Sequence, residues 1–592
     1  MKERIILDIE TLEQKGDKYK MNLGAKDKIL IGIYDGETYL QFSDFTEMLE
    51  YLFNEFKDFT VYAHNGGKYD YMYLLEECLG KYKITNIIKI NSSVTFNLRR
   101  DKNIIKFRDS IRLIPGSLEK LCKAYDCQHK KIKLEYDYPY PIEIISEYLK
   151  YDCLALFEVI EKFEKEMRNI ISYFNFDRYI TIAQMSFSIL QKQLNGICDN
   201  YFTKETENWI RESYYGGRVE CYKKYGKGLF YYDVNSLYPF AMLDKYPIGR
   251  HYYMDNPQKI LKLIKKGNLG IVECEIDMPY SKICLLPYRC DKRLYFPYGH
   301  FSGCYTSVEL KEAIIRGAVI KPKCSLFYSE SDNIFYPFIK KFYGMKENNV
   351  GVKREIAKYI LNTSYGKFGQ RRKQQQIFSL EEKFNSQYDD FEILSDYFFS
   401  REKVTYKNRK INPIYASFIT AYSRIYMYQI MERIGFDNIY YTDTDSIICS
   451  KKLDKSLIHN TAIGLLKEEY KNVTGIWLAP KLYGFKGINL KNEETEEIKM
   501  KGVDYSVKKE INFKKFCKIS ENMNFCFTAK RMVGFSSKFN MVKYREGKEF
   551  AILDKFDKEL KCLYDKRKLC GNDFLPICIK EIEQLKSLKI HT

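Results

Sequence analysis

Two short acidic segments, about two hundred residues apart, most constrain what this chain can fold into. The first is Tyr231–Pro239, where an apolar run delivers Asp233 and then turns into a helix. The second is Tyr441–Ser446, a Tyr-Thr-Asp-Thr-Asp-Ser run flanked by isoleucines, which predicts a buried hairpin. A lone carboxylate at a strand end is usually a helix cap. Two such elements together can hold two divalent metals, as in-line transfer of a nucleotidyl group requires.

Three further acidic motifs lie in the first 175 residues. Asp8 and Glu10 alternate on an apolar strand, so both carboxylates leave the same face, and buried like charges are costly unless a metal neutralises them. A second apolar strand leads through a Gly-Gly turn to Asp70 at the start of a helix. Tyr148 and Asp152 are four residues apart and share one helical face, where a tyrosine hydroxyl can orient an attacking water.

The segment Lys353–Gly369 has the period of a helix. Lys358, Asn362 and Tyr365 follow one another at steps of four and three, so they fall near one face. A cation, an amide and an aromatic ring in one stripe suit a triphosphate and a nascent base pair. The alternative is an amphipathic surface helix, in which an asparagine that looks buried and an internal glycine would be costly.

Composition favours a polyanionic partner and argues against a zinc protein, a membrane protein and a secreted protein. The chain has 97 Lys and Arg against 78 Asp and Glu, a net charge of +19, which suits nucleic acid although a lysine-rich proteome would give the same balance. Its 17 cysteines include no Cys-x-x-Cys pair, which indicates reduced thiols rather than a zinc site. No apolar run is long enough to span a bilayer, and the N-terminus is typical of a strand rather than a signal peptide, so a cytoplasmic location is expected.

Taken in their order along the chain, the motifs resemble those of family B DNA polymerases, and the resemblance covers nearly the whole chain. The segments around Asp8 and Glu10, Asn65–Asp70, and Tyr148–Asp152 resemble the three 3′–5′ exonuclease motifs. The polymerase motifs A, B and C are matched by Asp233–Pro239, Lys358–Gly366 and Tyr441–Ser446, with Thr363 where the family usually has serine. The resemblance implies an α/β multidomain fold, with a ribonuclease-H-like exonuclease domain and a right-hand polymerase domain of palm, fingers and thumb.

In the exonuclease site the resemblance implies four metal ligands: Asp8, Glu10, Asp70 and Asp152. Tyr148 would position the attacking water. The residues that would contact a single-stranded 3′ end are Thr11, His64, Asn65 and Tyr69, although a histidine such as His64 is by itself more often structural. Ser110 and Ser117 both compete for the serine of the family's Ser-Leu element, and the supporting lysine of this site is not identified.

In the polymerase site the resemblance implies catalytic roles for Asp233, Asp443 and Asp445. Asp233, the Val234 carbonyl and Asp445 would bind two Mg²⁺ ions, for which Mn²⁺ can substitute, while Asp443 would contact metal part of the time. The nucleotide-binding residues would be Tyr238, Lys358, Asn362 and Tyr365. The DNA contacts outside the exonuclease motifs would be Tyr214, Gly216 and Gly217 of a Tyr-x-Gly-Gly element, Lys481 and Tyr483 of a Lys-x-Tyr element, and Lys499.

The expected domains follow the chain. They are an exonuclease domain (1–175), a linker and first part of the palm with motif A (176–250), a first insertion (251–335), fingers with motif B (336–370), a second insertion (371–411), the palm with motif C (412–503) and a thumb (504–592). The first insertion is irregular and proline-containing in sequence. Insertions at these two places are typical of the protein-primed subgroup, in which they are called terminal-protein regions.

The resemblance therefore predicts a DNA-directed DNA polymerase with a proofreading exonuclease, which replicates a linear genome from a protein primer with strand displacement. Its expected partners are DNA, dNTPs, a terminal protein and a single-strand-binding protein, and a monomer is expected. Two alternatives are a family B polymerase that starts without a protein primer, and an inactive nucleic-acid-binding descendant. The intact carboxylates of both sites argue against the second alternative.

Overall fold

The computed structural model describes most of the chain. The described residues are 4–11, 20–21, 29–78, 81–90, 93–130, 132, 141–199, 202–291, 293–371, 373–379, 391–393, 398–404, 410–501, 503, 508–521, 524–532, 550–551, 553–561 and 564–590. Within these residues, none of the helices combines the length and apolar character needed to cross a bilayer.

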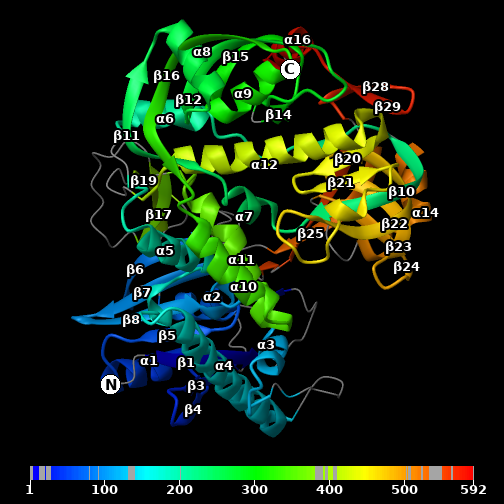
Figure 1. Ribbon diagram of the computed structural model, residues 1–592. Helices are drawn as coiled ribbons and strands as arrows, with labels where there is room; N and C mark the ends of the chain where they lie inside the picture. The colour runs from blue at the N-terminus through cyan, green and yellow to red at the C-terminus, as the bar shows by residue number, and fades with distance from the viewer. Residues whose placement is uncertain are drawn as a thin grey trace.

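The first domain is built on a mixed sheet, drawn in blue in Figure 1. Strand β1 (Arg4–Thr11) is parallel to β5 (Thr60–Ala63) and antiparallel to β3 (Ile29–Tyr34). Next to β5 lies the parallel strand β8 (Asn103–Asp109). The sheet continues with β7 (Ser93–Arg100) and β6 (Lys83–Ile90) beyond β8, and with β4 (Tyr39–Phe42) beyond β3. The helices of this domain are α1 (Phe45–Glu55), α2 (Asp70–Cys78), α3 (Leu118–Ala124) and α4 (Ile142–Ile170).

The alternation of side chains along β1 decides where its two acidic residues point. Successive residues of a strand face opposite sides of the sheet. Ile5, Leu7 and Ile9 belong to a core shared with residues of α1 and α2. Ile6 belongs to a different core, which contains apolar residues of α4. The two acidic residues, which have even numbers like Ile6, therefore lie on the side of the sheet that α4 covers.

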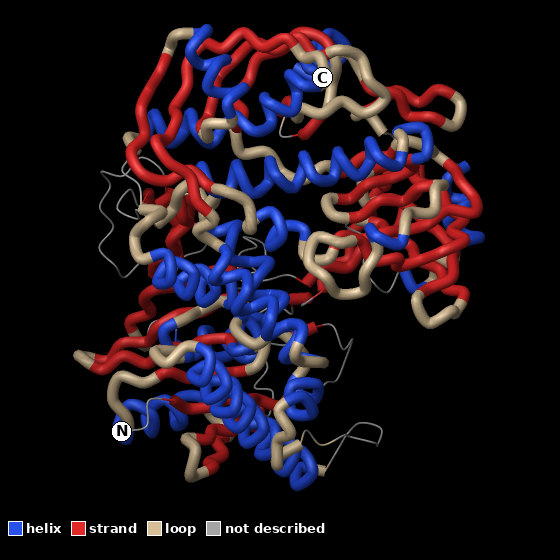
Figure 2. The backbone as a smooth tube through the Cα atoms, in the orientation of Figure 1, coloured by secondary structure: helices blue, strands red, loops and turns tan. Residues whose placement is uncertain are grey.

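A second, antiparallel sheet, which we call the catalytic sheet, lies far from the first (Figures 1 and 2). Its strands, in spatial order, are β24 (Glu494–Met500), β23 (Leu482–Asn489), β22 (Leu466–Ala479), β10 (Tyr225–Val234), β21 (Ser446–Cys449), β20 (Ile439–Asp443) and β9 (Val219–Cys221). The long helix α12 (Pro413–Ile434) is buried along most of its length and runs toward this sheet. The predicted buried hairpin around Tyr441–Ser446 is the β20–β21 pair.

The segment from 251 to 335, irregular in sequence, folds into an ordered unit. Four strands pair in the order β11 (Tyr246–Met254), β16 (Val319–Asp332), β12 (Gly270–Met278) and β15 (Gly299–Thr306), and two of its helices are α8 (Pro257–Lys266) and α9 (Ser307–Ile315). Two of its prolines sit where proline is tolerated. Pro257 opens α8, and Pro322 lies at the register shift between β12 and β16.

The helix predicted from Lys353 to Gly369 is present but ends early. Helix α11 (Gly351–Ser364) is followed by a 3-10 turn, η4 (Tyr365–Lys367), and packs against α10 (Tyr336–Glu347) and α5 (Ile182–Leu194). Gly369 lies beyond both elements. A β-carbon on Gly369 would come within 2.5 Å of the Tyr214 ring, so this glycine allows a close approach of chain segments rather than continuing the helix.

The second predicted insertion contributes strands to the first domain. β17 (Lys373–Ser379) pairs with β19 (Phe398–Val404), which pairs with β18 (Phe391–Ile393). β17 also pairs with β6 through Ile377 and Ile87, so the sheet of the first domain continues into the insertion. The remaining residues between 380 and 409 lie outside the described residues.

The C-terminal part of the chain forms two separate units. Strands β25 (Asn524–Met532) and β27 (Leu553–Lys561) pair with each other in a separate antiparallel sheet. The segment that follows comprises β28 (Arg567–Cys570), β29 (Asp573–Pro576) and α16 (Ile579–Ile590). It returns to the catalytic sheet and the first insertion, because Ile577, Ile579 and Ile582 belong to their shared core. Residues 564–590, part of the expected thumb, thus pack on the catalytic sheet and on the segment from 251 to 335.

Candidate active sites

The catalytic sheet brings the predicted polymerase carboxylates to one end of the three neighbouring strands β10, β21 and β20. Asp233 lies near the end of β10, and Asp443 and Asp445 flank the turn between β20 and β21. Asp233 is paired with Ser446 in the antiparallel register of β10 and β21. The Val234 amide donates to the Asp445 carbonyl at 2.8 Å. Two segments about two hundred residues apart in sequence are therefore joined directly through their backbones.

Burial makes this carboxylate cluster costly in the absence of a cation. Burial raises the pKa of Asp233 to about 8, and the charges of Asp445 and Glu469 add to the effect. Burial also raises the pKa of Asp445 to about 6, with a contribution from Asp443. Partly buried carboxylates that disfavour one another's ionisation fit a site for divalent cations.

Asp443 is turned toward the predicted Lys-x-Tyr element. Lys481 Nζ lies 3.2 Å from Asp443 Oδ1, and the Lys481 amide donates to the Tyr441 hydroxyl at 3.0 Å. The rings of Tyr441 and Tyr483 are 4.9 Å apart between centroids. Lys499, the other basic residue predicted here, lies on β24 with its Nζ 3.1 Å from Glu497. The structure thus joins the Lys-x-Tyr element to the turn of motif C.

The turn between Asp443 and Asp445 rests on the Tyr-x-Gly-Gly element. Thr444 has a positive φ of 62°, and its amide donates to the Arg218 carbonyl at 2.8 Å. A β-carbon on Gly217 would lie 2.8 Å from the Thr444 methyl group, so only glycine allows this approach. Gly216 has open space where its β-carbon would be. The requirement for glycine is therefore specific to the second position of the pair.

A buried ion pair anchors the same loop to the first insertion. Arg424 of α12 donates through Nη1 to the carbonyls of Tyr215 at 2.6 Å and Gly216 at 3.0 Å. Its Nε donates to Glu309 of α9 at 2.9 Å, and both side chains are buried. The insertion is thereby bonded to the loop that supports the catalytic turn.

Helix α11 presents the predicted nucleotide-binding residues on its open face. Lys358 and Asn362 are exposed and Tyr365 is partly exposed, whereas Ile356, Ala357, Ile360, Leu361 and Ser364 are buried. Asn362 had looked buried from the sequence, because its neighbours are apolar, and the structure corrects this. The ring of Tyr365 stacks on that of Tyr238, with centroids 4.3 Å apart, so motifs A and B meet.

Sequence reasoning missed a lysine at this site. Lys346 of α10 is 8% exposed, and its Nζ donates to the Ser236 hydroxyl of motif A at 2.7 Å. Burial, together with the charges of Arg354 and Lys358, lowers the pKa of Lys346 to about 8. Lys346 is twelve residues before Lys358 on another helix, so no periodicity or motif singles it out.

The first domain gathers the other predicted carboxylates between β1, α2 and α4. Asp70 begins α2, and burial raises its pKa to about 7, with contributions from the charges of Asp109 and Glu10. Burial raises the pKa of the Cys153 thiol, and the charges of Asp8, Asp152 and Asp70 raise it further. Since Cys153 follows Asp152 on α4, the aspartates of three elements lie around one point. Tyr148, partly buried, lies one helical turn before Asp152.

The histidine of the second exonuclease motif is held within the protein. His64 Nε2 lies 2.8 Å from the Gly116 carbonyl, which only accepts, so Nε2 carries the proton. His64 Nδ1 lies 2.9 Å from the Ser110 hydroxyl, whereas Ser117 caps α3. The structure thus brings Ser110, and not Ser117, beside this motif. Asn65 has a positive φ of 70° and Tyr69 packs edge-on against Tyr73, while the side chain of Thr11 lies outside the described residues.

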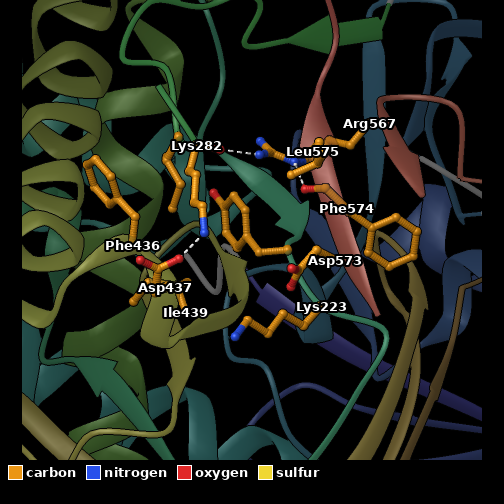
Figure 3. Close-up of a pocket in the computed structure, with 11 residues that line it drawn as sticks. Lys223, Lys282, Phe436, Asp437, Ile439, Arg567, Asp573, Phe574 and Leu575 are labelled. Atoms are coloured by element: carbon orange, nitrogen blue, oxygen red, sulfur yellow. Dashed lines mark hydrogen bonds and ion pairs between the residues drawn. The ribbon is translucent and has the colours of Figure 1, made fainter. Parts of the chain in front are cut away.

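No preformed metal site is present among the described residues, in the sense of three or more Asp, Glu, His or Cys side chains grouped closely enough to hold an ion. A pocket occurs elsewhere, where Tyr222, Lys282 and Asp437 meet the paired strands β28 and β29 (Figure 3). It is lined by Arg567, which donates to the Lys282 and Phe574 carbonyls, and Lys282 pairs with Asp437. This pocket includes none of the predicted site residues.

The geometry defines a protein with two separate carboxylate sites, and comparison with known proteins identifies its family. A family model of type B DNA polymerases, organellar and viral, matches residues 54–140 and 139–435. Because this match covers more than half of the chain, the chain belongs to that family. The resemblance drawn from the motifs is thereby confirmed.

Individual relatives agree with the family. The chain is similar to a probable DNA polymerase of Neurospora intermedia, with 28% identity over 82% of this chain and 58% of the relative. It is 27% identical to the DNA-directed DNA polymerase of Enterobacteria phage PRD1, over 71% of this chain and 72% of that one. The chain spans only about half the length of such fungal relatives. It covers 44% of a probable DNA polymerase of Ascobolus immersus.

Solved structures confirm the fold class. Phi29 DNA polymerase complexed with primer-template DNA and incoming nucleotides matches with a TM-score of 0.72 and 15% identity, over 95% of this chain and 99% of that chain. Phi29 DNA polymerase complexed with single-stranded DNA matches with a TM-score of 0.68 and 16% identity, over 93% of this chain and 99% of that chain. The fold is therefore the predicted multidomain α/β fold, and it matches that of phi29 DNA polymerase over nearly the whole chain.

Proposed function

We propose that this chain is a DNA-directed DNA polymerase with a separate 3′–5′ proofreading exonuclease. The observation that carries the proposal is the pairing of two distant acidic segments through Val234 and Asp445, which concentrates carboxylates beside the open face of α11. The second acidic site, on the α4 side of β1, supports the exonuclease. A template, a primer and dNTPs are the corresponding partners.

In the polymerase site, Asp233, Asp445 and the Val234 carbonyl would hold two Mg²⁺ ions, and the raised pKa of Asp233 fits such cations. When bound, these ions activate the primer 3′-hydroxyl and neutralise the triphosphate. Lys358 would bind the triphosphate together with Lys346, whose head group reaches motif A. The stacked rings of Tyr238 and Tyr365 would lie under the sugar, where their bulk excludes a 2′-hydroxyl.

In the exonuclease site, Asp8, Glu10, Asp70 and Asp152 would hold the metals, and Tyr148 would orient the attacking water. Ser110 would be the serine of the Ser-Leu element, because its hydroxyl bonds to His64 while Ser117 is occupied as a helix cap. The remaining predicted contacts, Asn65 and Tyr69, would bind the single-stranded 3′ end, and Thr11 stays a prediction. Both ring nitrogens of His64 are bonded within the protein, so His64 would support this binding surface and not contact the DNA through its nitrogens.

The test compares two variants of the full chain. Asp445→Ala should abolish primer extension and leave the degradation of a single-stranded oligonucleotide at the wild-type rate. Asp8→Ala combined with Asp152→Ala should do the reverse. If either variant loses both activities while it keeps the wild-type melting temperature, the two-site proposal fails. A wild-type protein that binds DNA but lacks both activities would identify an inactive descendant.

We further propose that synthesis starts from a protein primer and displaces the non-template strand. The support is that ordered segments occur at both expected insertion places, and that the first of them bonds through Glu309 to Arg424 of α12. The experiment supplies labelled dNTP, Mg²⁺ and genome ends, with and without an extract of the native source. Nuclease-resistant label on a protein supports protein priming. Label confined to free oligonucleotides made by the enzyme alone would favour initiation without a protein primer.

A further inference from the structure

An aspartate outside the recognised motifs lies beneath the exonuclease site. Asp109 is the last residue of β8, next to Ser110, and is 1% exposed. A buried carboxylate of this kind is costly unless hydrogen-bond donors surround it. Donors from three different parts of the first domain surround Asp109.

Both oxygens of Asp109 are occupied. Oδ1 accepts from the Asn65 amide at 2.9 Å and from the Ile111 amide at 3.3 Å. Oδ2 accepts from the Ser93 hydroxyl at 2.9 Å and from the Gly67 amide at 3.3 Å. An ionised carboxylate offers about four lone-pair sites. Four donors fill them, so Asp109 is not arranged to bind a metal.

The segment that Asp109 holds is the turn that leads to Asp70. This turn begins with Asn65 at a positive φ of 70° and continues as the short 3-10 helix η1 (Gly66–Lys68). It lies so close to β7 that a β-carbon on Gly67 would come within 2.1 Å of the Ser93 hydroxyl. A β-carbon on Gly66 would come within 2.4 Å of that of Ala63. The turn is therefore tightly placed, and Asp109 supplies two of its backbone contacts.

We propose that Asp109 is a positioning residue of the exonuclease site, which fixes the Asn65–Lys68 turn so that Asp70 faces the carboxylates of β1 and α4. The proposal rests on the proposed exonuclease function. The strands themselves do not need this carboxylate, because β8 is held by its pairing with β5 and β7. A change at Asp109 should therefore alter the position of the turn more than the stability of the sheet.

The test is Asp109→Asn in the full chain. The substitution keeps the shape but replaces one acceptor oxygen by an NH₂ group, which then points at an N–H donor of the turn or at Ser93. Loss of a residue that orients a metal ligand typically costs about 10- to 100-fold in metal affinity or activity. We expect a loss of that size in exonuclease rate at limiting Mg²⁺, and primer extension at the wild-type rate.

Two comparisons separate positioning from other roles. In Asp109→Asn the Mg²⁺ concentration for half-maximal exonuclease rate should rise, and the rate should recover at saturating Mg²⁺ or Mn²⁺. Ser93→Ala is the matched control, since it removes one donor to the same oxygen and leaves both backbone bonds to the turn. Its loss should be smaller than that of Asp109→Asn, because the amides of Asn65 and Gly67 keep the carboxylate as their acceptor.

Several outcomes would overturn the proposal. An unchanged exonuclease rate in Asp109→Asn would show that the turn needs no such support. A loss that saturating metal does not restore would show that Asp109 acts on something other than metal binding, and a lower melting temperature with equal loss of both activities would indicate a purely structural role. A wild-type chain that extends primers but degrades no DNA would overturn the proposed exonuclease and the role of Asp109 with it.

Discussion

The two acidic sites of this molecule differ in the charges that surround them. In the polymerase site, Lys467 and Lys358 partly offset the rise in the pKa of Asp233, and Lys481 and Lys358 do so for Asp445. In the exonuclease site, the charges that act most strongly on Asp70 are those of Asp109 and Glu10, which add to its rise. Both clusters contain carboxylates that act on one another, and lysines offset part of this effect at Asp233 and Asp445, whereas the charges of Asp109 and Glu10 add to it at Asp70.

This difference follows from what each site is proposed to bind. A nucleoside triphosphate brings several negative charges, so a site for it needs fixed cations beside its metal ligands. A single-stranded DNA end brings a single reacting phosphate. The proposed exonuclease site therefore needs fewer fixed cations beside its metal ligands. The comparison predicts that lysine substitutions separate the two activities, as carboxylate substitutions do.

The largest effect is expected at Asp445. Asp445→Asn removes a charge that would hold metal, and loss of metal-based stabilisation, worth several kcal/mol, corresponds to a decrease in primer extension on the order of 1,000-fold. The exonuclease rate on a single-stranded oligonucleotide should stay within about twofold of wild type, since its carboxylates lie in another domain. Both rates are measured on one preparation. A parallel loss of exonuclease activity would show that the sites are not independent.

A smaller effect is expected at the lysines of the fingers. Lys358→Ala and Lys346→Met each remove a charged contact to the triphosphate, so kcat/KM for dNTP should fall about 10- to 100-fold through KM. Lys340→Met, on the exposed side of α10, is the control. Exonuclease rates should not change. If Lys346→Met behaves like Lys340→Met, then Lys346 only supports the Ser236 turn.

The pH dependence of metal activation should also differ between the sites. Protons and metal compete for the carboxylates, so the Mg²⁺ requirement falls about tenfold per pH unit while the pH lies below the carboxylate pKa, and then levels off. The exonuclease should level off near pH 7, the pKa of Asp70, and the polymerase near pH 8, the pKa of Asp233. Mg²⁺ titrations between pH 6 and 9 measure this, and coincident plateaus would contradict it.

The smallest effect is expected at the loop that contains the Tyr-x-Gly-Gly element. Glu309→Gln weakens the bond to Arg424 and hence the anchoring of the Tyr215 and Gly216 carbonyls. A loss of about 1 kcal/mol predicts about a fivefold shift in the ratio of exonuclease to extension on a primed template. Glu312→Gln on the same helix, whose partner Arg316 is outside the loop, should leave the ratio unchanged. Equal ratios in both variants would remove the loop from this role.

What the sequence could predict was local. Alternation along β1 placed Asp8 and Glu10 on one face, and the hairpin and helix periods placed the residues around Asp445 and Lys358. What it missed depends on contacts between distant segments. Lys346 reaches Ser236 across 110 residues, and Asp109 reaches Asn65 across 44. The order within 251–335 was missed because the four strands of its main sheet pair with neighbours that are distant in sequence.

The return of the C-terminal segment also sets the order in which the molecule can be completed during synthesis. Glu220 of β9 bonds to Arg567, 347 residues later, and at about 5–20 residues per second this partner emerges roughly 20–70 s after it. The strands β1 and β3 to β8 of the first sheet are finished by Asp109, and β17, β18 and β19 join them later. A nascent chain therefore carries most of its N-terminal sheet for much of its synthesis, whereas Glu220 of the catalytic sheet lacks its partner Arg567 during that interval.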